Sequence, residues 1–252
     1  MTVSKNPARS AALRFIAFAL VVTLLCLLFG RAAIAFIDRR DSKNSTDADA
    51  GAHHVRVVID AGHGGEDGGT SGGGLTEKDV NLAVAQSLYD ILSAAGVECV
   101  MTRTDDRLLY DAYGDLSDYT GRKKVYDLRN RLRIANEHDG AVFVSIHMNF
   151  FSSKKYSGLQ VWYSPNDKSS QTMANLVQST VRNYLQPDND RETKRAGSSI
   201  YLLNRIKSPA ILVECGFLSN DDECARLADP AYRQKLALAM SEGILEFLQG
   251  QG

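Results

Sequence analysis

The chain has 252 residues, 44% of them hydrophobic and 23% charged, with a formal net charge of −1. This is an ordinary composition for a globular protein, and the length suffices for one domain with a substantial core. Residues 1–37 contain four basic and no acidic side chains, so residues 38–252 carry 25 basic against 30 acidic ones. That balance argues against a nucleic-acid binder, which needs a basic surface.

The N-terminus has the pattern of an export segment. Basic residues precede the uncharged apolar run Phe15–Gly30, and Ala33-Ile34-Ala35 resembles a cleavage site with small residues. The run is short for a spanning helix, which needs about 20 residues, although residues 15–37 suffice if Arg31 snorkels. We predict that residues 1–37 are a signal peptide or a membrane anchor, rather than a buried core helix. The domain would then act at the extracytoplasmic face of the membrane or in the cell wall.

A polar segment separates this leader from the folded part. Residues 38–54 are rich in Asp, Ser and Ala, as in a flexible linker. The catalytic domain is expected over residues 55–250, without internal repeats or a second wall-binding module.

Strands and helices are predicted to alternate along this domain. Strands are expected at Val55–Asp60, Val97–Thr102, Ala141–Ile146, Leu159–Ser164, Ser199–Asn204 and Ala210–Cys215. Helices are expected from Thr76 to Gly96, at Asp127–Glu137, at about 168–185 and at about Pro230–Leu248. This alternation predicts an α/β sheet sandwiched between helices. The polar stretch 103–126 is expected to be a long loop over the site.

Two histidines occupy equivalent places. His63 follows a buried strand and lies in a glycine-rich turn, and His147 ends another buried strand. Sites of open α/β sheets form at such carboxyl ends, so the repetition favours metal binding over two separate structural roles. A catalytic zinc site needs a third ligand from a His or a carboxylate. Glu66, Asp67 and Glu77 are candidates that spacing alone does not separate.

Glu214 interrupts the apolar strand predicted at Ala210–Cys215. A carboxylate there is costly unless it is paired, bound to a metal or functional. One interpretation is a buried ion pair with an arginine. The catalytic interpretation makes Glu214 a general base toward an attacking water.

Four blocks of the sequence, taken together, resemble one family, the zinc-dependent N-acetylmuramoyl-L-alanine amidases. These blocks are Asp60-Ala61-Gly62-His63-Gly64-Gly65, Leu75-Thr76-Glu77-Lys78, Ser145-Ile146-His147 with Asn149, and Val213-Glu214 with Gly216-Phe217-Leu218-Ser219-Asn220. They have the order and spacing of the family across nearly the whole domain.

The resemblance implies the fold, the chemistry and the site. It implies one domain with a twisted, mixed but mostly parallel sheet that has helices on both faces. It implies zinc (Zn2+) on His63, Glu77 and His147, with Glu214 as the catalytic acid/base. The substrate would be peptidoglycan, cut between the lactyl group of N-acetylmuramic acid and L-alanine.

Further residues resemble the spore-cortex branch of the family. They are Lys124 with Asp127-Leu128-Arg129-Asn130-Arg131, Ser157-Gly158-Leu159-Gln160, Ile200-Tyr201-Leu202-Leu203 and Lys207-Ser208-Pro209-Ala210. In that branch, a muramic acid deacetylase acts after the amidase, and we expect such a partner here.

Several roles beyond these are predicted for single residues. Asn149 is expected to orient a metal ligand or to contact the substrate. Asp60 is expected to support a metal-binding histidine from behind. Arg195, in a basic stretch with Arg191 and Lys194, is expected to meet peptide carboxylates, unless that stretch is a solvated loop.

Three other functions also fit parts of the pattern. A zinc peptidase would cut within the stem peptide instead. A wall-binding protein or amidase regulator would need no catalytic residues, yet all four site residues are present. A phosphate-binding loop would lack the Gly-Lys-Ser/Thr ending and leave His63 unexplained.

Overall fold

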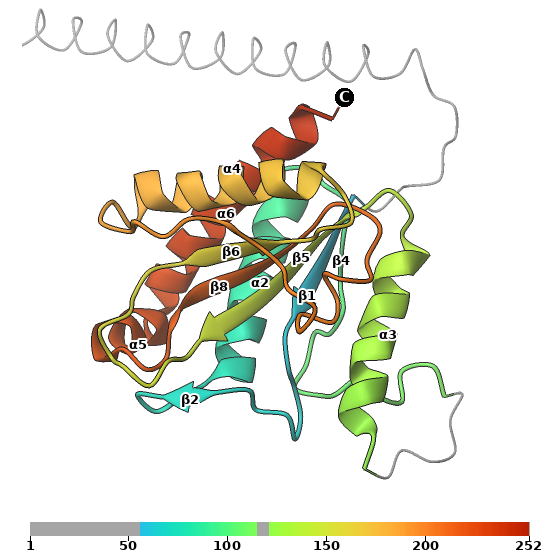
Figure 1. Ribbon diagram of the computed structural model, residues 1–252, viewed down its shortest axis with the longest axis horizontal. Coiled ribbons are helices and arrows are strands. Elements are labelled where there is room, and N and C mark those ends of the chain that lie inside the picture. Colours follow the sequence, from blue (N-terminus) through green and yellow to red (C-terminus); the bar gives the residue numbers. More distant parts are fainter. Residues whose placement is uncertain (1–55, 115–120, 252) are drawn as a thin grey trace, which may run out of the picture. The chain divides into compact units, whose positions relative to one another are not determined.

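A six-stranded sheet lies at the centre of residues 56–114 and 121–251, the part of the chain that the computed structural model describes (Figure 1). Its strand order is β4-β1-β5-β8-β6-β7. The strands are Cys99–Met101 (β4), Val57–Ala61 (β1), Val142–Asn149 (β5), Ala210–Phe217 (β8), Gln160–Tyr163 (β6) and Lys194–Arg195 (β7). All neighbours are parallel except β8 and β6, which confirms the mixed, mostly parallel sheet.

Helices cover both faces of the sheet, as predicted (Figure 1). One face packs against α2 (Glu77–Ala94), α4 (Ser169–Tyr184) and α6 (Pro230–Gln249), and the larger apolar core lies between them. The other face packs against α3 (Lys123–Glu137) and the segment 196–206 around a smaller core. The short α5 (Asp221–Ala228) follows β8, and a small ladder of β2 (Ser71–Gly72) and β3 (Leu75–Thr76) precedes α2.

The alternation of side chains along the strands decides which face carries the polar residues. Val58 of β1 and Phe143 of β5 belong to the smaller core on the α3 side. Successive strand side chains point to opposite faces, so Asp60 and His147 share that side. The functional side chains of the strands therefore lie on the α3 face, at the C-terminal ends of β1, β5 and β8.

One predicted strand is wrong. Residues 199–204 form turns, with Ile200 accepting a hydrogen bond from the Asn204 N–H and Leu202 one from the Ile206 N–H. Leu202, Leu203 and Ile206 are buried in the smaller core. The apolar run therefore covers the sheet instead of joining it.

Several element boundaries also differ from the predictions, and two of these differences concern residues near the site. Helix α3 begins at Lys123 rather than Asp127, and β5 continues through His147 to Asn149. The predicted leader 1–37 and linker 38–54 lie outside the described residues. Among the described helices, none is long and apolar enough to cross a membrane.

Candidate metal and catalytic site

The turn after β1 places His63. His63 has a φ of 61°, in the left-handed region that non-glycine residues seldom occupy. The preceding residue is Gly62, and a Cβ atom at this position would overlap the imidazole of His147. The glycines therefore let the β1 turn approach the end of β5 closely.

Glu77 is the first residue of α2, and its side chain is almost fully buried. Its carboxylate accepts hydrogen bonds from the backbone N–H of Thr70, at 2.8 Å, and of Met148, at 3.1 Å. The helix N-terminus favours a negative charge there. These contacts fix one carboxylate oxygen between the two histidines.

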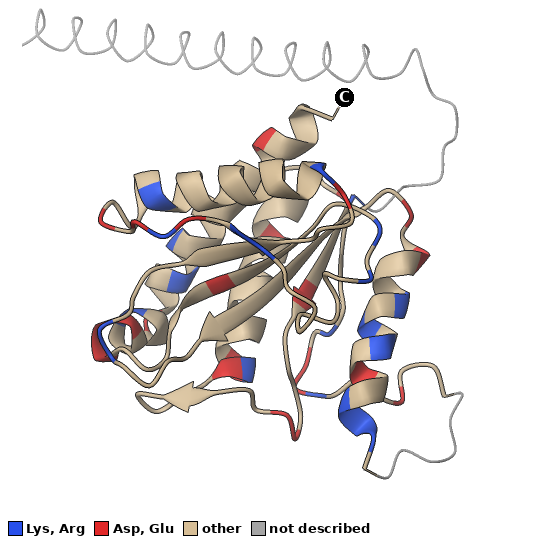
Figure 2. Cartoon of the chain, in the orientation of Figure 1, with Lys and Arg blue, Asp and Glu red and all other residues tan. Residues whose placement is uncertain are grey.

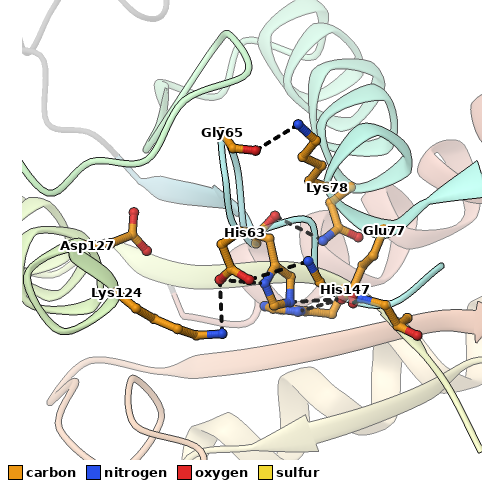
Figure 3. A network of polar contacts seen from close by, with 12 residues as sticks. His63, Gly65, Glu77, Lys78, Lys124, Asp127 and His147 are labelled. Carbon is orange, nitrogen blue, oxygen red and sulfur yellow. Dashed lines mark hydrogen bonds and ion pairs between the residues drawn. The ribbon is translucent and has the colours of Figure 1, made fainter. Parts of the chain in front are cut away.

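His63, Glu77 and His147 converge on one point (Figure 3). Each offers one ligand atom, and these atoms all lie within 4.8 Å of one another. Glu77 Oε1 lies 3.0 Å from His147 Nδ1 and 3.3 Å from His63 Nε2. A tetrahedral zinc with bonds of about 2.1 Å requires ligand atoms about 3.4 Å apart. The donor set and its spacing therefore fit zinc.

Electrostatics in the cluster keep Glu77 ionised. Burial by itself would raise the pKa of Glu77, but hydrogen bonds with His147 and His63 hold that pKa well below its ordinary value. For His63, burial would lower the pKa, and the contacts with Glu77 and Asp67 raise it instead. A permanently ionised carboxylate beside two imidazoles suits a divalent cation.

The two competing carboxylates have other partners. Asp67 Oδ2 lies 3.0 Å from His63 Nδ1 and 3.1 Å from Lys124 Nζ of α3. Glu66 forms an ion pair with Lys123. Asp67 therefore binds the far nitrogen of the His63 ring, as partners of metal-binding histidines typically do.

Glu214 faces this cluster from the neighbouring strand. It pairs in register with His147 across β5 and β8. The long strands are almost free of charged residues, and Asp60 and Glu214 are the acidic exceptions (Figure 2). Burial raises the pKa of Glu214 to about 7. Its Oε2 atom is buried and has no hydrogen-bond partner among the described residues.

Among the described residues, Asp60 forms no hydrogen bond with a histidine side chain, and its predicted role behind a metal-binding histidine stays a prediction. Its carboxylate accepts hydrogen bonds from Thr102, Ser145 and Arg131, at 2.6 to 2.7 Å. Burial would raise the pKa of Asp60, yet Arg131 holds that pKa below its usual range. Within the described part of the chain, Asp60 thus belongs to a buried ion pair behind the turn.

The predicted substrate contacts are spread over the site. Asn149 Oδ1 accepts the N–H of Phe150, and Arg195 is exposed on the edge strand β7. Their roles toward substrate stay predictions. Arg191, from the same basic stretch, bonds through Nη2 to Gln160, the register partner of Glu214.

Arg191 is thus the basic residue that the structure brings toward Glu214. Its guanidinium also lies 4.8 Å from the ring centroid of Phe217. Nothing in the sequence separates Arg191 from Lys194 and Arg195, because the distinction depends on the chain path after α4.

An α/β sheet with a His/Glu/His cluster at its C-terminal strand ends, and a half-buried glutamate with an unpartnered carboxylate oxygen beside it, is the arrangement expected of a hydrolase active site. The family model of N-acetylmuramoyl-L-alanine amidases matches residues 57–246. The chain belongs to this family, whose members are hydrolases acting on the peptidoglycan of the cell wall.

Similar proteins include spore enzymes. The chain is 36% identical over 196 residues to the germination-specific N-acetylmuramoyl-L-alanine amidase of Bacillus subtilis, covering 78% of this chain and 81% of that protein. It resembles the CwlD amidase of Clostridioides difficile, solved in complex with the GerS lipoprotein. That match has a TM-score of 0.72 at 35% identity and covers 78% of this chain and all of that one.

A further solved relative has the same fold. The amidase AmiC2 of Nostoc punctiforme matches with a TM-score of 0.65 at 34% identity, over 79% of this chain and 99% of that one. The fold is thus that of the amidase family.

Proposed function

We propose that the chain is a zinc-dependent N-acetylmuramoyl-L-alanine amidase in which His63, Glu77 and His147 hold the metal. Zinc held there would polarise the lactyl carbonyl and lower the pKa of a water molecule. The convergence of two imidazoles and one carboxylate, with ligand atoms within 4.8 Å of one another, supports this assignment.

Glu214 supplies the proton transfers in this proposal. Its carboxylate takes a proton from the attacking water and later delivers a proton to the amine of L-alanine as the amide bond breaks. Burial raises the pKa of Glu214 to about 7 before a metal binds, and this raised pKa suits a group that must both accept and release a proton. The unpartnered Oε2 atom beside the metal cluster is the single observation that carries this role.

Metal analysis tests the ligand set directly. The purified full-length chain is expected to bind one zinc ion per molecule, and His63→Ala and His147→Ala are expected to lose it. His138→Ala is the matched control, because His138 follows α3 outside the cluster. Full zinc content in the two ligand variants would overturn the assignment.

We further propose that the enzyme acts on the spore cortex, before a muramic acid deacetylase. The similarity to the germination-specific amidase of Bacillus subtilis supports this placement. Peptidoglycan treated with the chain is expected to become a substrate for the deacetylase, whereas untreated or Glu214→Gln-treated peptidoglycan is not. Equal deacetylation of both samples would contradict the order.

Export by residues 1–37, as a signal peptide or membrane anchor, is part of the same proposal, because peptidoglycan lies outside the membrane. Its support is the pattern of charged and apolar residues in the sequence. Deleting residues 1–37 is expected to retain the protein in the cytoplasm. Unchanged export of the deletion variant would contradict it.

A further inference from the structure

Helix α3 presents three charged side chains toward the His63 turn. Lys124, Asp127 and Arg131 are spaced at i, i+3 and i+7, which places them on one face of the helix. Figure 3 shows Lys124 reaching from α3 toward His63, with Asp127 on the same helix. The amidase chemistry above assigns no task to this motif.

Arg131 holds the backbone of the turn. Its guanidinium is almost fully buried and donates from Nη1 to the Ala61 carbonyl, at 2.8 Å, and from Nη2 to the His63 carbonyl, at 2.6 Å. Asp127, 2.8 Å from Nε, and Asp60, 2.6 Å from Nη1, balance its charge. The planar fork of arginine reaches several separated acceptors at once, whereas the three donors of a lysine ammonium all start from one nitrogen.

A second buried arginine completes this support. Arg103 donates from Nε to the Ala61 carbonyl, at 2.8 Å, and from Nη2 to the Gly62 carbonyl, at 3.0 Å. Its Nη2 also reaches the Lys78 carbonyl, at 2.8 Å, in the first turn of α2. Three consecutive carbonyls of the turn thus point at buried guanidinium groups, and these contacts stabilise the unfavourable φ of His63.

The ring of His63 is held from the same helix. Asp67 Oδ2 lies 3.0 Å from Nδ1 of His63 and 3.1 Å from Nζ of Lys124. With Nδ1 engaged as a donor, Nε2 is left to face Glu77, 3.3 Å away. Such a contact fixes both the tautomer and the orientation of a metal-binding imidazole.

We propose that α3 is the positioning element of the metal ligand His63: Arg131 fixes its backbone, and Lys124, through Asp67, fixes its imidazole. The proposal rests on the proposed zinc site. It also links the site to the segment before α3, because Asp127 accepts the Leu109 N–H, at 2.7 Å. A shift of α3 would therefore move His63 and that segment together.

Zinc affinity, measured by competition with a chelator in the full-length chain, tests this role. Arg131→Lys and Asp67→Ala are each expected to weaken zinc binding about 10- to 100-fold, the usual effect of removing such supporting contacts. Arg233→Lys is the control for the arginine, because Arg233 also donates to two carbonyls, of Leu227 and Ala228. Glu66→Ala is the control for the acid, since it removes a pair with Lys123 of α3.

A second readout separates positioning from general stability. If Arg131 acted only on the fold, Arg131→Lys would lower the Tm of the metal-free and the zinc-loaded chain equally. Positioning predicts that zinc raises the Tm of Arg131→Lys and of Asp67→Ala by less than it raises the Tm of the wild type. Asp67 is the more exposed of the two residues, so Asp67→Ala should fold even if Arg131→Lys does not.

The outcomes distinguish the two proposals. Tight zinc binding by the wild type together with unchanged affinity in Arg131→Lys and Asp67→Ala would overturn the role of α3 and leave the zinc site intact. A wild type without zinc affinity would overturn the zinc site itself, and the ligand role of His63 with it.

Discussion

The role proposed for Glu214 depends on the surroundings of its carboxylate. No described residue hydrogen-bonds its Oε2 atom, and burial is the main cause of its raised pKa. Leaving a carboxylate buried without a partner destabilises a fold. Such a cost at one residue beside three candidate metal ligands is typical of a catalytic group, which needs its oxygen free for substrate.

The pH dependence of kcat/KM should reflect the ionisation of Glu214. Burial raises the pKa of Glu214 to about 7, and a bound zinc cation lowers it again, because a nearby positive charge favours the ionised form. The base must be ionised, so kcat/KM is expected to rise with pH, with a midpoint between 4.5 and about 7. The profile is measured on a soluble muropeptide at constant free zinc. A rate that falls as the pH rises between those values would contradict this role.

Gly62 tests the close approach of the turn to β5. Gly62→Ala places a methyl group on the His147 ring, and overpacking of this kind costs about 1–3 kcal/mol. We expect lower stability and weaker zinc binding, measured by thermal unfolding and chelator competition. Gly197→Ala is the control, because a Cβ added there would have no described atom outside its chain neighbours within 4 Å. Equal stability and equal zinc affinity in the two variants would refute the steric clash between a Cβ at position 62 and His147.

At the level of elements, the sequence predicts where the central strands end. It does not predict which apolar segment packs on the face of the sheet instead of joining it. The apolar runs at β1, β5 and β8 are rich in Val and Ile, which favour strands, so their positions follow from the sequence. The run 199–204 is equally apolar, yet it packs as turns on the smaller core. Short apolar runs do not distinguish a strand from other buried structure.

The same limit applies to the site. His63, His147 and Glu214 could be singled out because each follows, ends or interrupts a predicted strand. The residues that support these side chains could not be predicted. Arg131, for example, contacts the backbone of His63 but lies 68 positions away in the sequence. The choice of Glu77 over Asp67 came from the family resemblance, and the structure shows the two in different contacts.

The packing of α4 on α6 depends on Gly243. A Cβ at this position would lie 2.7 Å from the Val177 backbone nitrogen. Overpacking costs about 1–3 kcal/mol, which exceeds the gain of up to about 1 kcal/mol that alanine brings to a helix. Gly243→Ala should therefore lower the free energy of unfolding in urea. Gly250→Ala, where the nearest contact is 3.6 Å, should not, and the reverse order would contradict the close packing.

For the whole molecule, zinc is expected to join elements that are distant in sequence. The turn after β1, the start of α2 and the end of β5 each supply one ligand atom. A ligand that binds only the folded state stabilises that state as a whole. Zinc bound at the proposed site would therefore contribute to the stability of the fold as well as to the chemistry.

Thermal unfolding measures this contribution. Free zinc at 100 times its Kd adds about 2.7 kcal/mol, and each kcal/mol shifts the Tm of a domain of this size by about 2–4 °C. The Tm is expected to rise by roughly 5–11 °C over the chelator-treated protein. A Tm that does not respond to zinc would contradict a site built from these three elements.

The most direct measurement is the mass of the products released from intact peptidoglycan by the full-length chain, with zinc, with chelator and for Glu214→Gln. The account predicts free stem peptides with a new N-terminal alanine. They should disappear with chelator and fall about 10²- to 10⁴-fold in the variant, while the variant keeps its zinc. Cleavage within the stem peptide, or release that survives both chelator and the loss of Glu214, would contradict it.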